Sequence, residues 1–181
     1  DVATGETTLV GGQEGIIGCW AWSPTGDRIL IAGDTEQTWQ LDLFVYEVAS
    51  GALRRLTDDL PCLPDAGFPA VSPPSQPVWL DDDTALLHAV RAGASGLYRV
   101  DEESGAVELV TQRTALAGAP SADAARRYIA QAQTSLEAPS AIVVHDRETG
   151  TERTITALNA AAPRPANWSR FDVRRNGETI E

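Results

Sequence analysis

The residues that could carry hydrolytic chemistry are one glycine-flanked serine and two histidines. A serine nucleophile in an α/β-hydrolase needs the pattern Gly-x-Ser-x-Gly on a strand-to-helix turn, and the string Gly93-Ala94-Ser95-Gly96 lacks that spacing. We interpret this string as a loop between strands. His88 lies within an apolar run, which is typical of a buried structural histidine, and His145 precedes Asp146 at a strand end. Because neighbouring residues of a strand point to opposite faces, His145 and Asp146 are poorly arranged for a proton relay. The sequence therefore predicts no catalytic residue.

Metal and cofactor chemistry has little support either. The run Asp81–Asp83 lacks the spaced ligands and the glycine of a calcium loop, so we interpret it as a solvated hairpin turn. Cys19 and Cys62 are the only cysteines, too few for a disulfide framework or a zinc site. We expect a buried free thiol at Cys19 and a loop thiol at Cys62, with a single disulfide between them as the less favoured alternative. No metal and no cofactor are expected.

Composition excludes two classes of partner. The 181 residues carry a net charge of −12, which repels phosphate backbones and argues against nucleic-acid binding. No apolar run is long enough to span a membrane, and no basic amphipathic segment is present to dock on acidic lipid. The chain contains no Met and opens directly in a turn pattern, so we interpret it as part of a longer polypeptide.

The elements that would position any site follow a repeat. Four turns end in glycine and precede a short alternating segment, at intervals of about 45 to 55 residues. These glycines are Gly5, Gly51, Gly105 and Gly150. Each later turn is preceded by a second polar turn and two apolar runs, which gives four short strands per unit. A unit of this length with four strands is typical of a propeller blade.

The sequence thus predicts an all-β fold, a β-propeller fragment over residues 1–158. Three complete blades are expected at about 15–58, 76–112 and 115–158, preceded by the last strand of another blade at Glu6–Val10. The middle strands are apolar on both faces, as strands must be when neighbouring blades cover the sheet on both sides. On the first strand of the first blade, Trp20 and Trp22 share a face, and we expect them to pack between blades rather than to bind a ligand.

The blade motif resembles the repeat of Tol-type and prolyl-oligopeptidase propellers. The turn Trp22-Ser23-Pro24-Thr25-Gly26 departs from that family pattern only at Thr25, and Leu56-Thr57 matches the end of a blade. The later blades match more loosely.

Residues 159–181 break the repeat and are expected to form a linker and a hairpin around Asn176-Gly177. This tail resembles the junction of acylaminoacyl peptidases, where the propeller leads into an α/β-hydrolase domain. The resemblance implies a non-catalytic propeller part of a cytoplasmic serine peptidase that gates the access of short peptides. Its partners would be the remaining blades and a hydrolase domain of the same polypeptide, with a homo-oligomeric parent possible. The alternative is a Tol-type propeller that acts as a protein-interaction module.

Candidate interface or gating residues come from the long connections, which must lie on one face of the propeller. These connections are about 33–41, 58–76 and 112–116, and the second is rich in proline. Because loops carry function more often than scaffold does, we select Trp39, Phe68 and Arg91 as candidates for contact with a partner domain or substrate.

Overall fold

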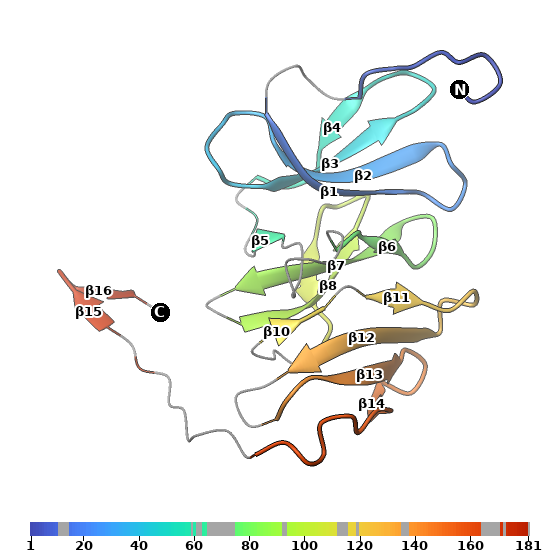
Figure 1. The fold of residues 1–181 in the computed structure, drawn as a ribbon. Helices are drawn as coiled ribbons and strands as arrows, with labels where there is room; N and C mark the ends of the chain where they lie inside the picture. The colour runs from blue at the N-terminus through green and yellow to red at the C-terminus, as the bar shows by residue number, and fades with distance from the viewer. Residues whose placement is uncertain are drawn as a thin grey trace.

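A computed structural model of the chain contains only strands, turns and irregular segments among the residues that it describes (Figure 1). Those residues are 1–10, 15–58, 60, 63–64, 75–91, 94–111, 116–118, 120–134, 138–163, 171 and 173–180. The strands form three antiparallel sheets and one separate hairpin. The all-β prediction is confirmed.

The first blade is a continuous four-stranded sheet in sequence order. Its strands are β1 (Ile16–Trp22), β2 (Arg28–Asp34), β3 (Asp42–Glu47) and β4 (Leu53–Arg55). Their bounds lie within three residues of those that the apolar runs predict. The outermost strand, β4, is fully exposed, as expected at the rim of a blade.

The second blade has an innermost strand in two pieces, β5 and β6, which both pair with β7. Its strands are β5 (Leu63–Pro64), β6 (Val78–Trp79), β7 (Thr84–Arg91), β8 (Ala94–Asp101) and β9 (Val107–Leu109). The sheet therefore begins before residue 76, inside the proline-rich connection. A second difference is that residues 94–96, expected in a loop, open strand β8, because Ala94 pairs with Arg91 across a tight hairpin.

The third blade repeats the divided inner strand with β10 (Leu116–Ala117) and β11 (Ser121–Ala122), followed by β12 (Tyr128–Thr134), β13 (Ala141–Asp146) and β14 (Thr151–Thr154). Beyond it, β15 (Val173–Arg175) and β16 (Glu178–Ile180) pair as a hairpin. Asn176 and Gly177 have φ angles of 53° and 86°, the positive values that a two-residue hairpin turn requires. The hairpin predicted from Asn-Gly is present.

The four glycine turns share one geometry. In each turn the glycine amide donates to the carbonyl four residues earlier, at 2.8–2.9 Å, with φ between 67° and 73°. These bonds run from Gly5 to Asp1, Gly51 to Glu47, Gly105 to Asp101 and Gly150 to Asp146. Residues 1–5 therefore form the turn that would close a preceding blade, and Val10 further along packs on the first blade.

A threonine, buried in the first two blades and half-buried in the third, fixes the end of each blade. The hydroxyls of Thr57, Thr111 and Thr156 each accept a hydrogen bond from a third-strand amide fourteen residues earlier, at 2.8–3.0 Å. The donors are the amides of Leu43, Leu97 and Ile142. These hydrogen bonds show which residues of the three blades occupy equivalent positions. Sequence similarity alone shows this only weakly.

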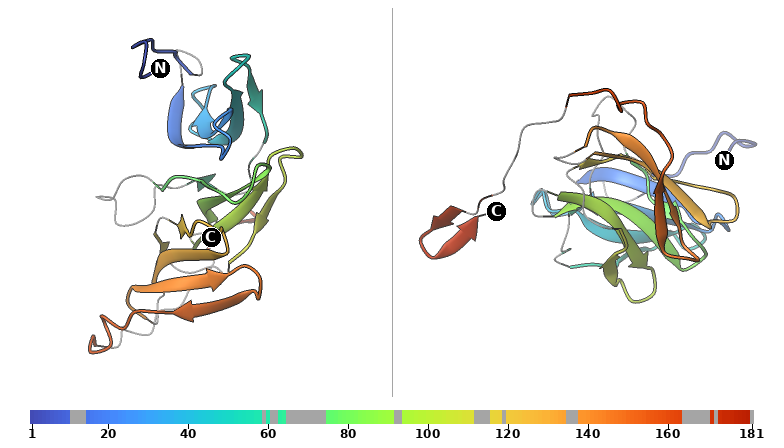
Figure 2. Two further views of the ribbon diagram at one scale, coloured as in Figure 1. Left: turned by 90° about the vertical axis from the view of Figure 1, so that its right-hand side faces the viewer. Right: turned by 90° about the horizontal axis from the view of Figure 1, so that it is seen from below.

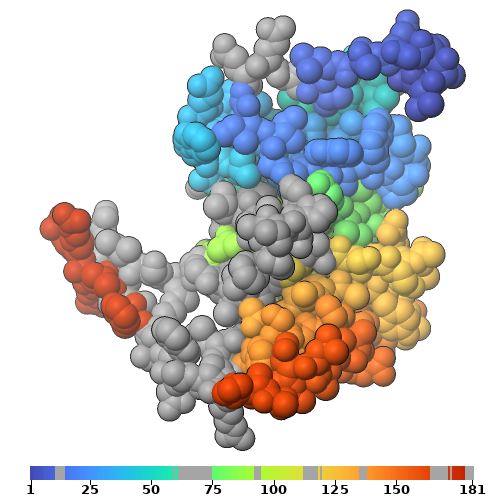
Figure 3. Space-filling model, viewed as in Figure 1, coloured from blue at the N-terminus to red at the C-terminus, as the bar shows by residue number. Residues whose placement is uncertain are grey.

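The blades stack face to face in a column (Figures 2 and 3). On β3, Leu43 and Val45 face the second blade, whereas Phe44 and Tyr46 face the other way. We call the contact between the first and second blades the first interface. We call the contact between the second and third blades, centred on Leu86, Leu97 and Ile129, the second interface.

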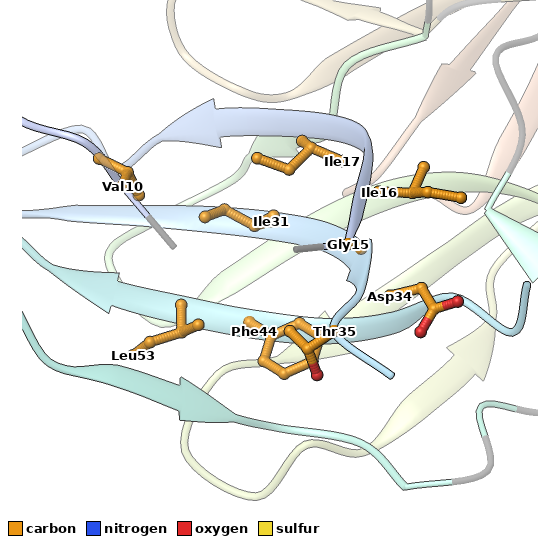
Figure 4. Close-up of a pocket in the computed structure, with 10 residues that line it drawn as sticks. Val10, Gly15, Ile16, Ile17, Ile31, Asp34, Thr35, Phe44 and Leu53 are labelled. Atoms are coloured by element: carbon orange, nitrogen blue, oxygen red, sulfur yellow. The ribbon is translucent and has the colours of Figure 1, made fainter. Parts of the chain in front are cut away.

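The outer face of the first blade is open in this stack. Ile17, Trp20 and Trp22 are 47–56% exposed there, and with Val10 they line an apolar hollow. Figure 4 shows an adjoining hollow on the same face. An apolar face of this size is typical of a buried contact surface, which fits a blade that is one of a longer ring.

Candidate functional site

The second strands of the three blades end at the same end of the column. β2, β7 and β12 run the same way in Figure 1, so Asp34, Arg91 and Thr134, which end these strands, lie at one end. Trp39 and Arg91 therefore share this end, which we call the loop face, but they belong to different blades. No hydrogen bond or ion pair joins their side chains among the described residues. Phe68 lies outside the described residues.

The loop after β2 is built around the carboxylate of Asp34. This side chain is only 4% exposed, and it accepts the amide of Glu36 at 2.8 Å and the amide of Trp39 at 2.6 Å. Burial works to raise the pKa of Asp34, but hydrogen bonds from the backbone amides of residues 36–39 outweigh it and lower the pKa. The ionised carboxylate is thus the centre on which the loop is folded.

Trp39 is presented to solvent by this loop in an unusual conformation. Its φ is 65° and that of Gln37 is 59°, in the left-handed region that bulky residues avoid at a cost of roughly 1 kcal/mol each. The hydrogen bonds to Asp34 offset that cost. The Trp39 side chain is nevertheless 80% exposed. An exposed tryptophan whose backbone is fixed in place is a suitable anchor for a partner, because aromatic anchors dominate binding energy at interfaces.

Arg55, on the outer strand of the same blade, braces the loop. Its guanidinium pairs with Glu36 at 3.1 Å, with Asp58 at 3.3 Å, and with the buried carboxylate of Asp42. The Asp42 carboxylate also accepts a hydrogen bond from Thr57 at 3.0 Å. The loop that carries Trp39 is therefore tied to the rim and to the end of the blade.

The residues that could do chemistry lie in two blades, His88 and Ser95 in the second and His145 in the third. His88 is buried on β7, and Ser95 is buried on β8. The Nδ1 atom of His145 lies 3.8 Å from Glu152, whereas Asp146 points to the opposite face of the sheet and pairs with Arg127 at 2.8 Å. His145 and Asp146 therefore face opposite sides of the sheet.

The metal and thiol predictions can be placed in part. Cys19 is a buried free thiol, and burial raises its pKa to about 11. Cys62 lies outside the described residues. Asp81–Asp83 form a turn in which the Asp83 amide donates to the Asp81 carboxylate at 3.2 Å. In the described segments, no three His, Cys, Asp or Glu side chains are arranged to hold a metal ion, and no helix could cross a membrane.

Asp34 was not selected from the sequence, although it organises the loop. In the sequence, Asp34 appears only as an aspartate at the end of a strand, followed by Thr and Glu. An aspartate in that place often accepts hydrogen bonds from the backbone amides that follow it. Such patterns are common in loops, so the one that orders an exposed tryptophan is recognised only from the fold.

Comparison with known proteins supports the fold rather than an activity. No family model and no curated protein matches the chain. The structure is similar to TolB from Acinetobacter baumannii, with a TM-score of 0.64 at 18% identity over 86% of this chain and 36% of that one. It is similar to a puromycin hydrolase, with a TM-score of 0.61 at 24% identity over 82% of this chain and 21% of that one.

A third similar structure is a puromycin-hydrolyzing peptidase from Mycobacterium tuberculosis. Its TM-score is 0.65 at 14% identity, over 96% of this chain and 26% of that one. The three stacked four-stranded sheets and these matches define the class: the chain is part of a β-propeller. More specifically, its fold is similar to that of TolB and of the two puromycin-hydrolysing enzymes. The chain spans about a fifth to just over a third of the length of these three proteins.

Proposed function

We propose that the chain is the non-catalytic propeller part of a serine peptidase of the prolyl-oligopeptidase or acylaminoacyl-peptidase type. In this role the propeller caps a hydrolase active site, admits short peptides and excludes folded proteins. The nucleophile, the base and the oxyanion donors belong to a hydrolase domain of the same polypeptide, and the parent enzyme works in the cytoplasm.

The extent of the structural matches carries this proposal. The predicted propeller portion is 158 of the 181 residues. The match to the Mycobacterium tuberculosis peptidase covers 96% of the chain, so it extends into residues 159–181, where the β15–β16 hairpin lies. The match to TolB covers 86%, which the propeller portion alone can supply. A likeness that includes the tail favours a parent in which the propeller leads into another domain.

The loop face supports the gating part of the proposal. The exposed Trp39 and the exposed, cationic Arg91 stand at the end of the column where β2 and β7 end. A surface that restricts access needs a loop that is fixed in place, since a mobile loop would yield to a larger substrate. The network of Asp34 and Arg55 supplies that fixation.

The second candidate function is a Tol-type propeller that binds a protein and has no attached enzyme. The fit to TolB favours it, because that alignment covers more of its target than either peptidase alignment does. In this case Trp39 would be an anchor for a protein partner rather than part of a gate.

The test uses the full-length polypeptide, labelled with a fluorophosphonate and assayed on acylated dipeptides and on the same dipeptide embedded in a folded domain. The proposal predicts labelling, cleavage of the dipeptides alone, and a Trp39→Ala variant that relaxes this size selection while stability is unchanged. Tyr128→Ala, an exposed aromatic on the third blade, is the matched control. No labelling supports the interaction module. Labelling with unchanged size selection in Trp39→Ala rejects the gating role of the loop face.

A further inference from the structure

A pocket of about 340 Å³ opens at the rim between the second and third blades. It lies wholly within the second interface, where both blades are present. The hollows on the open face of the first blade are different, because they lie where another blade would pack. The pocket therefore belongs to the propeller whatever surrounds the column, and its volume is near the lower end of small-molecule sites.

The floor of the pocket is apolar and rigid. Leu86, Leu97 and Ile129 come from β7, β8 and β12, and each is at most 2% exposed. Together with Leu80 they form the apolar cluster of the second interface. A small hydrocarbon group placed on this floor would lose contact with water without any rearrangement of the strands.

The wall carries more positive than negative charge. Arg99 is paired with Glu108 at 2.7 Å, and His145 lies beside Glu152. Arg147 has no carboxylate within ion-pair distance among the described residues. Its Nη1 instead donates to the backbone carbonyl of Arg126 at 2.6 Å. Arg147 is an exposed residue that lines the pocket, so its guanidinium is accessible from solvent.

The first interface shows how the residue equivalent to Arg147 is paired there. By the equivalence of the threonine bonds, Glu102 of the second blade corresponds to Arg147 of the third. The Glu102 carboxylate lies between Arg28, at 2.8 Å, and Arg54. The first interface thus holds a carboxylate from the chain itself between two guanidiniums. In the second interface that position carries a cation, and the pocket lies between the blades.

We propose that this pocket binds a small amphipathic carboxylate. Its hydrocarbon part would lie on Leu86, Leu97 and Ile129, and its carboxylate would bind Arg147, the residue that takes the position of Glu102 in the third blade. Arg99 lies on the same wall, where it is paired with Glu108. The geometry favours a compact aromatic or branched acid over a long chain, because the space is enclosed by two blades. This proposal is independent of any peptidase activity.

The test measures the binding of 4-phenylbutyrate to the full chain by calorimetry and by saturation-transfer NMR. A dissociation constant of about 1 mM or tighter is expected for a ligand of this size. Arg147→Gln should weaken binding about tenfold, the loss expected for one charge-assisted hydrogen bond, and Arg147→Lys should recover part of it. Arg153→Gln is the matched control, because Arg153 is exposed and faces away from the second blade.

Neutral 4-phenylbutyramide separates the charge from the hydrocarbon. The proposal expects it to bind at least about tenfold more weakly than the acid. Equal binding of acid and amide, equal binding by Arg147→Gln and the unmodified chain, or no saturable binding at millimolar acid would each overturn the proposal.

Discussion

The two interfaces between blades use the same backbone and different side chains. At the first, Leu43 and Val45 meet the apolar strands of the second blade, and Glu102 joins the blades through two arginines. At the second, the apolar cluster is smaller, and the buried Ser95 and Gln131 hold side-chain oxygens without a hydrogen-bond partner in the described part of the chain. The repeat therefore fixes how a blade is built, whereas the side chains decide how tightly neighbouring blades join.

The largest expected effect on the free energy of unfolding comes from replacing a leucine by alanine at equivalent positions of the two interfaces. Leu43 and Leu97 occupy the same place in the threonine hydrogen bond, and both are almost fully buried. Leu43→Ala leaves a dry cavity and should lower the free energy of unfolding by about 4 kcal/mol. Leu97→Ala enlarges a pocket that already opens to solvent, so about 2 kcal/mol is expected.

Urea denaturation followed by tryptophan fluorescence measures both values. Ala substitution of the exposed Leu158 controls for loss of a leucine as such. Equal losses for Leu43→Ala and Leu97→Ala would mean that the two interfaces are packed equally well, and would remove the basis of the comparison.

The next effect concerns the ionic link of the first interface. Glu102→Gln keeps the shape of the side chain but removes the charge that faces Arg28, whose side chain is largely buried. A loss of about 2 kcal/mol is expected, because a partly buried guanidinium is left without its counter-charge. The neighbouring Glu103→Gln, on an exposed residue, should cost almost nothing. Thermal unfolding of the two variants in parallel makes the measurement, and a stable Glu102→Gln would show that the arginines find other acceptors.

The third effect has the opposite sign and belongs to the second interface. Gln131 is 5% exposed, and its Oε1 accepts no hydrogen bond within the described residues. Gln131→Leu removes a desolvated polar group at similar volume and should stabilise the chain by about 1 kcal/mol. The midpoint of urea unfolding tests this. A destabilised variant would indicate that a bound water or another group satisfies the amide.

The sequence could predict what depends on local turn chemistry. Gly51, Gly105 and Gly150 marked the repeat because a positive φ is cheapest for glycine, and Asn176-Gly177 marked the hairpin for the same reason. Trp39 was selected only because it lies in a long connection. The sequence did not suggest the fixation of Trp39 by Asp34, because that fixation depends on amides of the loop turning inward.

The features missed from the sequence depend on contacts between distant segments. The entry of Leu63–Pro64 into the second blade could not be read from the proline-rich run, because a two-residue strand has no detectable period. The pocket at the second interface was missed for a related reason. It depends on which residues of one blade face which residues of the next, and on Arg147 standing where the previous blade has Glu102.

The smallest effect tests the turn that precedes the second strand in the two outer blades. In the first blade Gly26 has a φ of 74° and donates to Ser23 at 3.0 Å, and in the third blade Arg126 has a φ of 57° and donates to Asp123 at 3.0 Å. Arg126→Gly should raise the free energy of unfolding by about 0.5 kcal/mol, because relief of the left-handed conformation slightly exceeds the added entropy of the unfolded chain.

The reverse change, at Gly26 of the first blade, isolates the cost of the backbone conformation. An added Cβ at Gly26 meets no neighbour, so Gly26→Ala should lower the free energy of unfolding by about 1 kcal/mol through the backbone alone. Differential scanning calorimetry of both variants decides the point. If Arg126→Gly were destabilising, the Arg126 side chain would contribute contacts of its own. The carbonyl that receives Arg147 is kept in the glycine variant, so the second interface would be unchanged and the difference would belong to the turn.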